Sequence, residues 1–485
     1  MNIGMDVQFV SGWEYFSKKT MDCNGNHYVG RIVSNVQFSE SQSPDRTYES
    51  DIISVSLNNN DYYFSKKMAD YSDYAIGNIS VIFRKPDGTI LKSTKVQQFS
   101  FGIGGDPPGH IFKVQCSNAI DMNKDITQKI DTDTWANAHD SAIGQVVPMV
   151  YNTVARIKAW KIDDRINQAD WLLGKAEIST ITKVSIGGID PVNSSYYSLG
   201  NDGTYWWVNM GHGNLYDRGN YCLVDVTTPT YTPVEIITDM LDGTVTVAAN
   251  TAFKTWLSNQ GYTAAKCRYY LRESMSASQL LQKFCESFEC NWRLNSSNEV
   301  EFTHIDPDNI STTYEFEPGE IASVNVSQDY QPKLIKNEIT YFYDLNYETN
   351  DYNEQAVYDG GNQGDVGIFQ DSVNFEFLTE SGQAEETAKQ RYLQHKEPPN
   401  EIRVQIPTTT NVAIDTIDTG DLVRVRCPDL QEPNPMLFKV LRKNADTDNN
   451  VINIDLENKN FMGPTWYINH GEGHLVWWAD QRIKI

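Results

Sequence analysis

The stretch LFKVLRKNADTDNNVINIDLEN (437–458) contains two runs, 437–442 and 451–458, in which apolar residues recur at nearly every second position. Successive side chains of a β-strand point to opposite faces of the sheet. The alternation therefore predicts two strands that each bury one face. The polar residues 443–450 interrupt the pattern between them. We expect this end of the chain to be β-structure.

The same alternation recurs along most of the chain. It appears in YVGRIVSNVQF (28–38), DIISVSL (51–57), ISVIFRK (79–85), IFKVQCS (111–117), VVPMVYN (146–152), ARIKAW (155–160), ITKVSIGG (181–188), IASVNVS (321–327), NEITYFYD (337–344), EIRVQIP (401–407) and DLVRVRC (421–427). Several short strands at this spacing favour a barrel or a sandwich. Closure into a barrel would bury one face of each strand and remove the exposed sheet edges.

Helical signals gather in the middle of the sequence. Pro233 suits the first position of a helix over 233–241, and a second helical run covers 249–261. Ser276-x-x-Gln279 is a capping box ahead of 279–288. Its apolar face should pack on a hairpin at 290–304, against Trp292 and Phe302; that face comprises Leu280, Leu281, Phe284 and Phe288. One more helix is expected at 381–396, ahead of Pro398 and Pro399.

These patterns predict a mainly β protein with an α/β insert. Its expected parts are an N-terminal β-barrel (1–115), a β-rich middle domain (116–230), an α+β insert (231–311), a second β-barrel with one helix (312–460) and a C-terminal tail (461–485). The two barrels are expected to be tube-like. Residues 200–220 are expected to form an ordered surface loop, and 346–367 a long polar excursion.

Composition and charge exclude several classes of protein. The 485 residues carry a formal net charge of −24, which argues against nucleic-acid wrapping because phosphate binding needs a cationic surface. The N-terminus lacks the pattern of a secretory signal, and no stretch reaches 18 apolar residues, so we expect no membrane insertion. Seven cysteines without a CxxC motif fit folding in a reducing cytoplasm.

No pattern predicts a catalytic, cofactor or metal site, and we expect the protein not to be an enzyme. His470 and His474 have ligand-like spacing, but Gly471 and Gly473 argue against a helix, and only Asp480 lies nearby as a third ligand. The other candidates are interpreted as buried thiols, a turn and solvated carboxylates; they are Cys285 with Cys290, Gly102 to Gly105, Asp131 with Asp133, and Asp163 with Asp164.

Several segments in a fixed order resemble one family, the phage tail hub proteins. VPMVYNTVARIKAWKIDD (147–164) resembles the family's "P-(L/I)-V-Y-G" strand and the strand after it, with Asn152 where glycine is usual. Asn also tolerates a left-handed backbone. The order and spacing match over about 115–460; the further similar segments are 9–13, 28–34, 171–188, 232–241, 275–306, 388–407, 417–430 and a closing hairpin at 438–457.

The resemblance implies a structural hub of a phage tail tip or baseplate, as in long-tailed phages, contractile tails and gene-transfer particles. With two barrels per subunit, a homotrimer would join the six-fold tail tube to the three-fold tip and line the DNA channel. The implied partners are a distal tail or tail tube protein, a tape measure protein and a tip fibre or spike protein, with genomic DNA only in transit. The implied location is the virion, after synthesis in the bacterial host cytoplasm.

Two other functions stay open at this point. The aromatic residues at 205–207 and 466–478 would suit a receptor- or carbohydrate-binding tail adhesin, and a tail-associated cell-wall hydrolase is the other alternative.

For a hub, the acidic composition predicts a channel lined with Asp and Glu, because acidic walls repel DNA. Residues 346–355 and 445–451 are candidates for that wall or for outer loops. Arg403, Arg424 and Arg426 should face neighbouring subunits or paired carboxylates.

Overall fold

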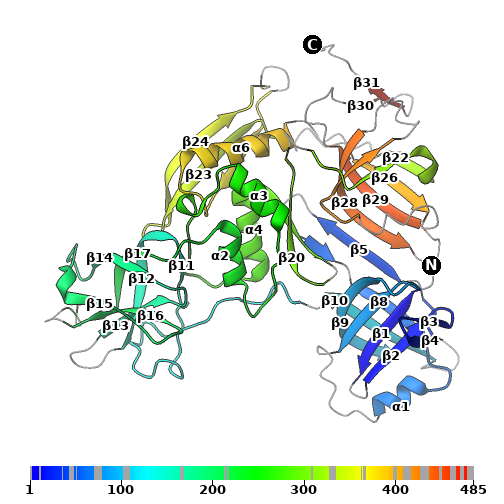
Figure 1. Ribbon diagram of the computed structural model, residues 1–485, viewed down its shortest axis with the longest axis horizontal. Helices are drawn as coiled ribbons and strands as arrows, with labels where there is room; N and C mark the ends of the chain where they lie inside the picture. The colour runs from blue at the N-terminus through cyan, green and yellow to red at the C-terminus, as the bar shows by residue number, and fades with distance from the viewer. Residues whose placement is uncertain are drawn as a thin grey trace. The chain divides into compact units, whose positions relative to one another are not determined.

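The computed structural model of the chain divides by its internal contacts into two units, each built from segments far apart in the sequence (Figure 1). Unit 1 comprises Met1–Asp121, Asn291–Ile335 and Glu397–Ile485; unit 2 comprises Met122–Cys290 and Lys336–Lys396. The structure describes residues 3–9, 12–34, 36–42, 48–50, 52–69, 79–101, 110–118, 120–163, 169–211, 215, 218–295, 297–306, 310–326, 335–361, 363, 367–396, 401–407, 417–426, 436–446, 451–458, 466–469 and 474–477.

The first sheet of unit 1 is formed by the N-terminal segment. Its strands follow the order β3-β4-β2-β1-β8-β9-β10-β7. The elements are β1 (Gly4–Phe9), β2 (Gly12–Ser17), β3 (Met21–Cys23), β4 (Asn26–Gly30), β7 (Ile53–Asn58), helix α1 (Tyr63–Ala69), β8 (Ser80–Arg84), β9 (Ile90–Phe101) and β10 (Ile111–Asn118).

Backbone hydrogen bonds also link β2 to β7. The amide of Ile32 donates to the Ser17 carbonyl at the end of β2, and the amide of Val33 donates to the Ser56 carbonyl in β7. The segment after β4 therefore connects these two strands of the curled sheet, which is a half-barrel. Inside, Phe64 of α1 stacks on Phe112 with ring centroids 4.6 Å apart, and both rings are buried.

The second sheet of unit 1 combines both ends of the chain. It follows the order β21-β27-β28-β29-β26-β22, and β5 pairs with both β28 and β6. The strands are β5 (Gln37–Gln42), β6 (Tyr48–Ser50), β21 (Tyr314–Phe316), β22 (Ser323–Val326), β26 (Glu401–Pro407), β27 (Leu422–Val425), β28 (Met436–Asp446) and β29 (Val451–Asn458). Two hairpins complete the described strands of unit 1. They are β19 (Cys290–Leu294) with β20 (Val300–His304), and β30 (Trp466–Asn469) with β31 (His474–Trp477).

The length of β28 explains how an N-terminal strand joins this sheet. Its first half pairs with β27, and its second half, from Arg442 to Asp446, pairs with β5 between Ser41 and Gln37. Figure 1 shows β5 beside β28. The sequence assigned 37–42 to the first barrel, but this strand completes the second sheet. Among the described strands, that sheet is a half-barrel with β21 and β22 at its ends.

In its described residues, unit 2 is built around a six-stranded sheet, a three-stranded sheet and the helices α2, α3, α4 and α6. The sheets follow the orders β14-β17-β12-β13-β16-β15 and β24-β23-β25, and β11 pairs with β18. The elements are β11 (Met149–Tyr151), β12 (Thr153–Asp163), β13 (Ala169–Gly174), β14 (Thr180–Ser185), β15 (Tyr197–Asn201), β16 (Trp206–Met210), β17 (Tyr221–Thr227), α2 (Pro233–Met240), α3 (Thr251–Asn259), β18 (Tyr269–Leu271), α4 (Ala277–Phe288), β23 (Glu338–Asn346), β24 (Asp351–Asp359), β25 (Gln370–Asn374) and α6 (Ser381–His395).

Helix α4 forms where its sequence predicts it. The Gln279 amide donates to Ser276 Oγ at 3.2 Å, and the Ser276 amide donates to Gln279 Oε1 at 2.9 Å, which completes the capping box. Phe284 is fully buried within unit 2, where its ring contacts Phe253 and Phe377. The expected partners Trp292 and Phe302 belong to unit 1.

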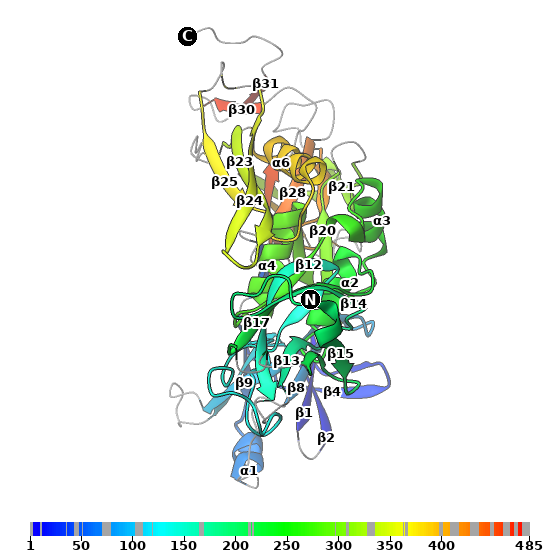
Figure 2. The ribbon, with the colours of Figure 1, turned by 90° about the vertical axis from the view of Figure 1, so that its left-hand side faces the viewer.

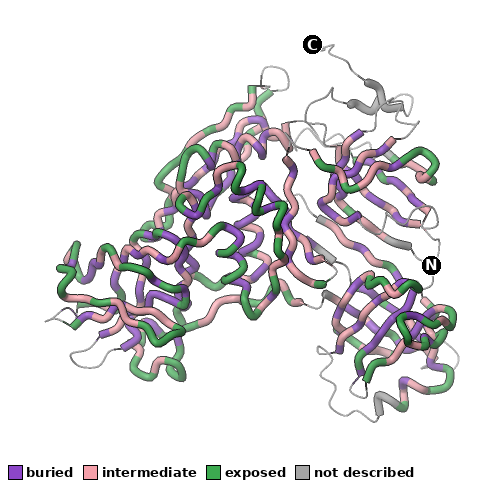
Figure 3. The backbone as a smooth tube through the Cα atoms, in the orientation of Figure 1, coloured by how far each residue is buried: buried purple, intermediate pink, exposed green. Residues whose placement is uncertain are grey.

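Three expectations about the middle of the chain are wrong. The expected loop at 200–220 contains most of the β15–β16 pair, and the expected polar excursion at 346–367 contains β24. The segment 336–396, expected inside the second barrel, belongs to unit 2, where α6 lies against β23 and β24 (Figures 1 and 2). β24 escaped detection because one of its faces is exposed and the other is only partly buried, and its residues therefore lack a clear apolar alternation (Figure 3).

Candidate functional site

The β23–β24 hairpin of unit 2 is held at its turn by three arginines. Two of them, Arg268 and Arg272, flank the short strand β18, and the third, Arg156, lies in β12. Arg268 donates from one guanidinium nitrogen to Asp344 Oδ1 at 2.7 Å and to the Leu345 carbonyl at 3.0 Å. The first arginine therefore fixes the end of β23.

Arg272 fixes the turn itself. Its guanidinium donates to the Tyr347 carbonyl at 2.7 Å and to the side-chain oxygen of Asn350. The guanidinium carbons of Arg268 and Arg272 lie 5.7 and 5.8 Å from the centroid of the Tyr347 ring, and the Tyr270 ring meets it edge-on at 5.3 Å. Cations near an aromatic face are attracted by its quadrupole, so ring and guanidinium groups stabilise one another.

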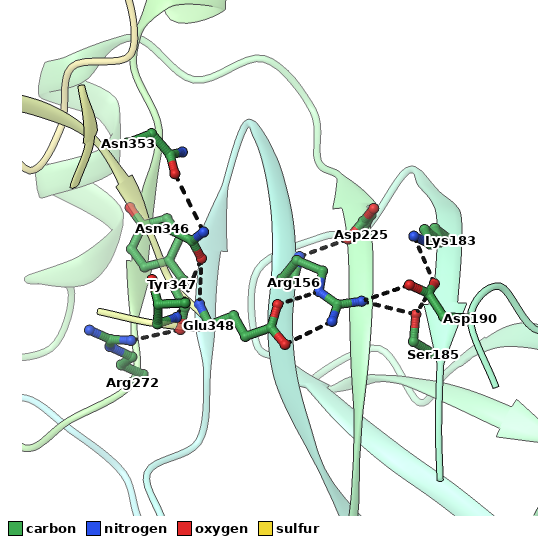
Figure 4. Close-up of polar contacts among 11 residues, drawn as sticks. Arg156, Lys183, Ser185, Asp190, Asp225, Arg272, Asn346, Tyr347, Glu348 and Asn353 are labelled. Carbon is green, nitrogen blue, oxygen red and sulfur yellow. Dashed lines mark hydrogen bonds and ion pairs between the residues drawn. The ribbon is translucent and has the colours of Figure 1, made fainter. Parts of the chain in front are cut away.

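Arg156 connects the hairpin to the six-stranded sheet (Figure 4). It lies at an irregularity of β12 and has a φ of 60°, where its amide donates to Asp225 Oδ1 at 2.7 Å. Its guanidinium forms two hydrogen bonds with the Glu348 carboxylate, at 2.6 and 2.7 Å. These bonds hold the pKa of Glu348 below its usual value. Such a paired geometry orients both groups.

A second carboxylate continues this cluster within unit 2. Asp190 accepts hydrogen bonds from Lys183 and Ser185, each at 2.7 Å, and lies 3.6 Å from the Arg156 guanidinium. The hydrogen bonds from Lys183 and Ser185 lower the pKa of Asp190. Arg156 is thus shared by Glu348 and Asp190, and both of these carboxylates have basic partners.

A cavity of about 220 Å³ lies beside the Arg272 contacts. Its wall contains four tyrosines, and Tyr269, Tyr270 and Tyr347 are buried. Four charged side chains complete the polar part of the wall; they are Arg272, Glu273, Lys283 and Glu376. Among the groups that the structure describes, these residues contain no nucleophile bonded to a general base.

The structure places the predicted acidic candidates in ordinary structural roles. Asp131 accepts a hydrogen bond from the Thr134 amide at 2.7 Å, which caps a turn and lowers the Asp131 pKa. Asp133 is exposed, whereas Asp163 is buried at a bulge of β12. Cys285 and Cys290 are fully buried. In the described part of the chain, no group of three or more His, Cys, Asp or Glu is arranged to hold a metal ion.

Some sequence candidates lie outside the described residues. These are Asp164, His470, Asp480, Gly102 to Gly105, and the side chains at 466–478, including that of His474. Within the described ranges, no helix has both the length and the apolar character needed to cross a membrane.

Asn152, Arg403 and Arg426 are placed as the sequence suggests. Asn152 has a φ of 65°, and its side chain donates to the Tyr231 and Cys267 carbonyls, so it takes the left-handed backbone expected at the usual glycine. Arg403 pairs with Asp455 at 2.5 Å, and Arg426 pairs with Glu315 at 3.0 Å. The structure gives Arg424 a half-buried side chain in β27.

The arginine-held hairpin escaped sequence reasoning. Arg268 and Arg272 stand on either side of the strand YYL, but their acceptors lie about 75 positions away and are partly backbone carbonyls. Backbone acceptors carry no sequence signal. The spacing of two arginines around a short aromatic strand was the available clue.

No protein-family model and no curated protein match the sequence. Among solved structures, the tail protein from Neisseria meningitidis MC58 is 8% identical, with 95% of this chain and 98% of that chain covered and a TM-score of 0.44. The 43 kDa tail protein of prophage MuSo2 from Shewanella oneidensis is also 8% identical, with 96% and 100% covered and a TM-score of 0.45.

The chain is similar to phage tail proteins. The prophage tail protein gp18 from Listeria monocytogenes EGD-e is a third example, 11% identical, with 95% of each chain covered and a TM-score of 0.37.

Proposed function

We propose that this chain is a structural hub protein of a phage tail tip or baseplate, and that three copies form a ring around a DNA channel. The observation that carries the proposal is the construction of unit 1. Its two curled sheets are connected by β5. This strand comes from the N-terminal segment but pairs with the C-terminal strand β28. Three such subunits supply six curled sheets, which suits a junction between six-fold and three-fold parts of a tail.

The hub role defines a set of partners and a location. We propose that the ring contacts a distal tail or tail tube protein on one side and a tip fibre or spike protein on the other, with the tape measure protein between them. Genomic DNA passes through in transit only. The chain is made in the host cytoplasm and works in the virion.

The described residues give less support to an adhesin or an enzyme. Around 205–207, the Tyr205 ring packs on Trp135 at 4.8 Å, and its hydroxyl bonds to the Gln128 side chain at 2.8 Å. In these contacts the Tyr205 ring packs against the protein, so it is not free to stack on a sugar. The charged clusters pair acids with bases and supply no reactive nucleophile, so we propose a non-enzymatic role.

Two measurements on the purified full chain test the proposal. Sedimentation velocity should give the mass of three chains, because a hub subunit must self-associate. Incubation with purified bacterial cell wall should release no soluble glycan. A strictly monomeric chain at high concentration would contradict the hub role, and glycan release would favour the hydrolase.

A further inference from the structure

Strand β24 forms one edge of the three-stranded sheet of unit 2. It pairs with β23 between Asp351 and Asp359, and within the described part of the chain no other strand pairs with it. The backbone groups on the side away from β23 therefore have no strand to bond to. Edge strands are commonly shortened, bulged or protected by Lys or Pro. β24 has nine residues, contains neither Lys nor Pro, and pairs with β23 without a register shift.

One face of β24 is open along its whole length. Asp351, Asn353, Gln355, Val357 and Asp359 alternate along the strand, and all five are exposed. The apolar side chain of Val357 is 55% exposed. An added strand would cover this side chain and bond to the free backbone groups beside it. Because the arginines at the turn already hold the hairpin in place, binding would require little further ordering of β24.

The acidic residues of β24 have no basic partner. Asp351, Glu354 and Asp359 form no ion pair with any Lys or Arg that the structure describes. Asp359 lies directly opposite Glu338 of β23, whose carboxylate accepts hydrogen bonds from two neutral side-chain amides. Like charges directly opposite each other destabilise a strand pair. A basic residue on a strand next to Asp359 would relieve this repulsion.

The same charges disfavour a second copy of this chain as the occupant. Antiparallel pairing of two β24 strands about Gln355 would set Asp351 of one copy opposite Asp359 of the other. The net charge of −24 on each copy adds to that repulsion. The pattern of charges therefore selects a strand that carries basic residues.

We propose that the free edge of β24 binds an extended segment of another protein by antiparallel strand addition. The segment carries Lys or Arg opposite Asp351, Glu354 and Asp359, and an apolar residue opposite Val357. Backbone hydrogen bonds supply the affinity, and the cross-strand side-chain pairs supply the selectivity. The inference concerns unit 2 alone and does not depend on the hub role or on trimer formation.

Binding of a designed peptide to the full chain tests the proposal. In an antiparallel register, the peptide KTVTTKTTK places its lysines opposite the three acids and its valine opposite Val357. Fluorescence anisotropy should show binding at peptide concentrations up to about 1 mM, and the amides of 351–359 should exchange hydrogen more slowly in the complex. The peptide ETVTTETTE should bind at least about tenfold more weakly.

A second control separates strand pairing from charge attraction. The lysine peptide is N-methylated at alternate residues, in each of the two possible registers, which keeps its charges. The form whose methyl groups face β24 cannot donate to it and should bind at least about tenfold more weakly than the unmodified peptide. No binding at about 1 mM, equal binding of the lysine and glutamate peptides, or binding without slower exchange in 351–359 would overturn the proposal. Slower exchange there on raising the concentration of the chain alone would assign the edge to a second copy instead and would also overturn it.

Variants of the chain locate the site. Asp351→Asn and Asp359→Asn together remove two charges from exposed side chains and should weaken binding of KTVTTKTTK about fivefold without unfolding the protein. The matched control combines Asp133→Asn with Asp242→Asn, which removes the same charge from exposed residues of unit 2 outside this sheet. This control should bind as the wild type does. If the two double variants bind the peptide equally, charge attraction at no particular place holds it, and the proposal is wrong.

Discussion

The β5–β6 insertion of unit 1 and the β23–β24 hairpin of unit 2 are both tied to their surroundings by charged side chains, but at very different depths. In unit 1, Glu40 of β5 pairs with Lys92, whose side chain is 9% exposed. In unit 2, the hairpin residue Glu348 is 39% exposed and its partner Arg156 is 27% exposed. The hairpin pair is therefore more hydrated than the pair between Glu40 and Lys92.

The buried charges of unit 1 form a network around Arg293. This residue donates to Asp421 at 2.7 Å, to Glu301 at 2.9 Å and to the Thr419 carbonyl at 3.1 Å. Lys443 of β28 donates to the Ile417 carbonyl at 2.6 Å, and its Nζ lies 3.9 Å from Asp418. Burial lowers the pKa of Lys443 and raises that of Asp418.

The difference in depth determines what each contact is worth. A buried charge that loses its partner keeps the cost of desolvation, about 3–5 kcal/mol, whereas an exposed ion pair contributes roughly 0–1 kcal/mol. The network around Arg293 should therefore contribute more to stability than the Arg156–Glu348 pair, which mainly sets the position of the hairpin.

The largest expected effect follows removal of the central cation of unit 1. Arg293→Met should lower the free energy of unfolding of unit 1 by about 3–5 kcal/mol, because Asp421 and Glu301 lose their partner. Urea denaturation followed by hydrogen exchange in 420–426 measures this. The control is Arg403→Met, which breaks a pair whose arginine is 54% exposed and should cost under about 1 kcal/mol. Equal losses would show that depth does not distinguish the two pairs.

A smaller effect is expected at Arg156, where the backbone has a φ of 60°. Arg156→Gly loses the pair with Glu348 but suits this backbone, so stability should change by no more than about 1 kcal/mol. Arg156→Val loses the same pair and places a branched side chain in a left-handed conformation, at a cost of about 2 kcal/mol. Denaturant unfolding of unit 2 compares the two variants, and identical results would refute a backbone contribution.

The smallest expected effect concerns the pH at which the carboxyl groups of Asp418 and Asp190 titrate. Burial raises the Asp418 pKa above its ordinary value of 3.8, so this group's contribution to stability falls as the pH rises from 3.8 through the folded value. Hydrogen bonds lower the Asp190 pKa, so its contribution is present above pH 3.8 and is lost as the pH falls through the folded value. Carboxyl-carbon NMR should show Asp418 titrating at a higher pH than Asp190, and the reverse order would contradict the comparison.

Local sequence signals predicted the parts of the fold that depend on neighbours in the chain. The strands at 437–442 and 451–458 and the capped helix α4 appear where their residues indicate. By contrast, the pairing of β5 with β28 joins residues about 400 positions apart. No periodicity within either strand specifies that partner, so the sequence assigned β5 to the wrong sheet.

The candidate site was invisible for a related reason. The hairpin strand β24 faces solvent on most of its length and has no apolar alternation to reveal it. The cavity gathers residues from β18, α4, β23 and β24, which come together only in the folded unit. Asn152, which lies outside this site, has the left-handed backbone that asparagine was expected to tolerate at a position where the family usually has glycine.

A cryo-EM reconstruction of the tail tip from assembled particles tests the hub proposal most directly. We predict a ring of three copies of this chain, with the curled sheets of unit 1 around the channel. Asp and Glu side chains should predominate on the channel wall. A six-fold ring of this chain, or a channel wall that is neutral or net positive, would contradict it.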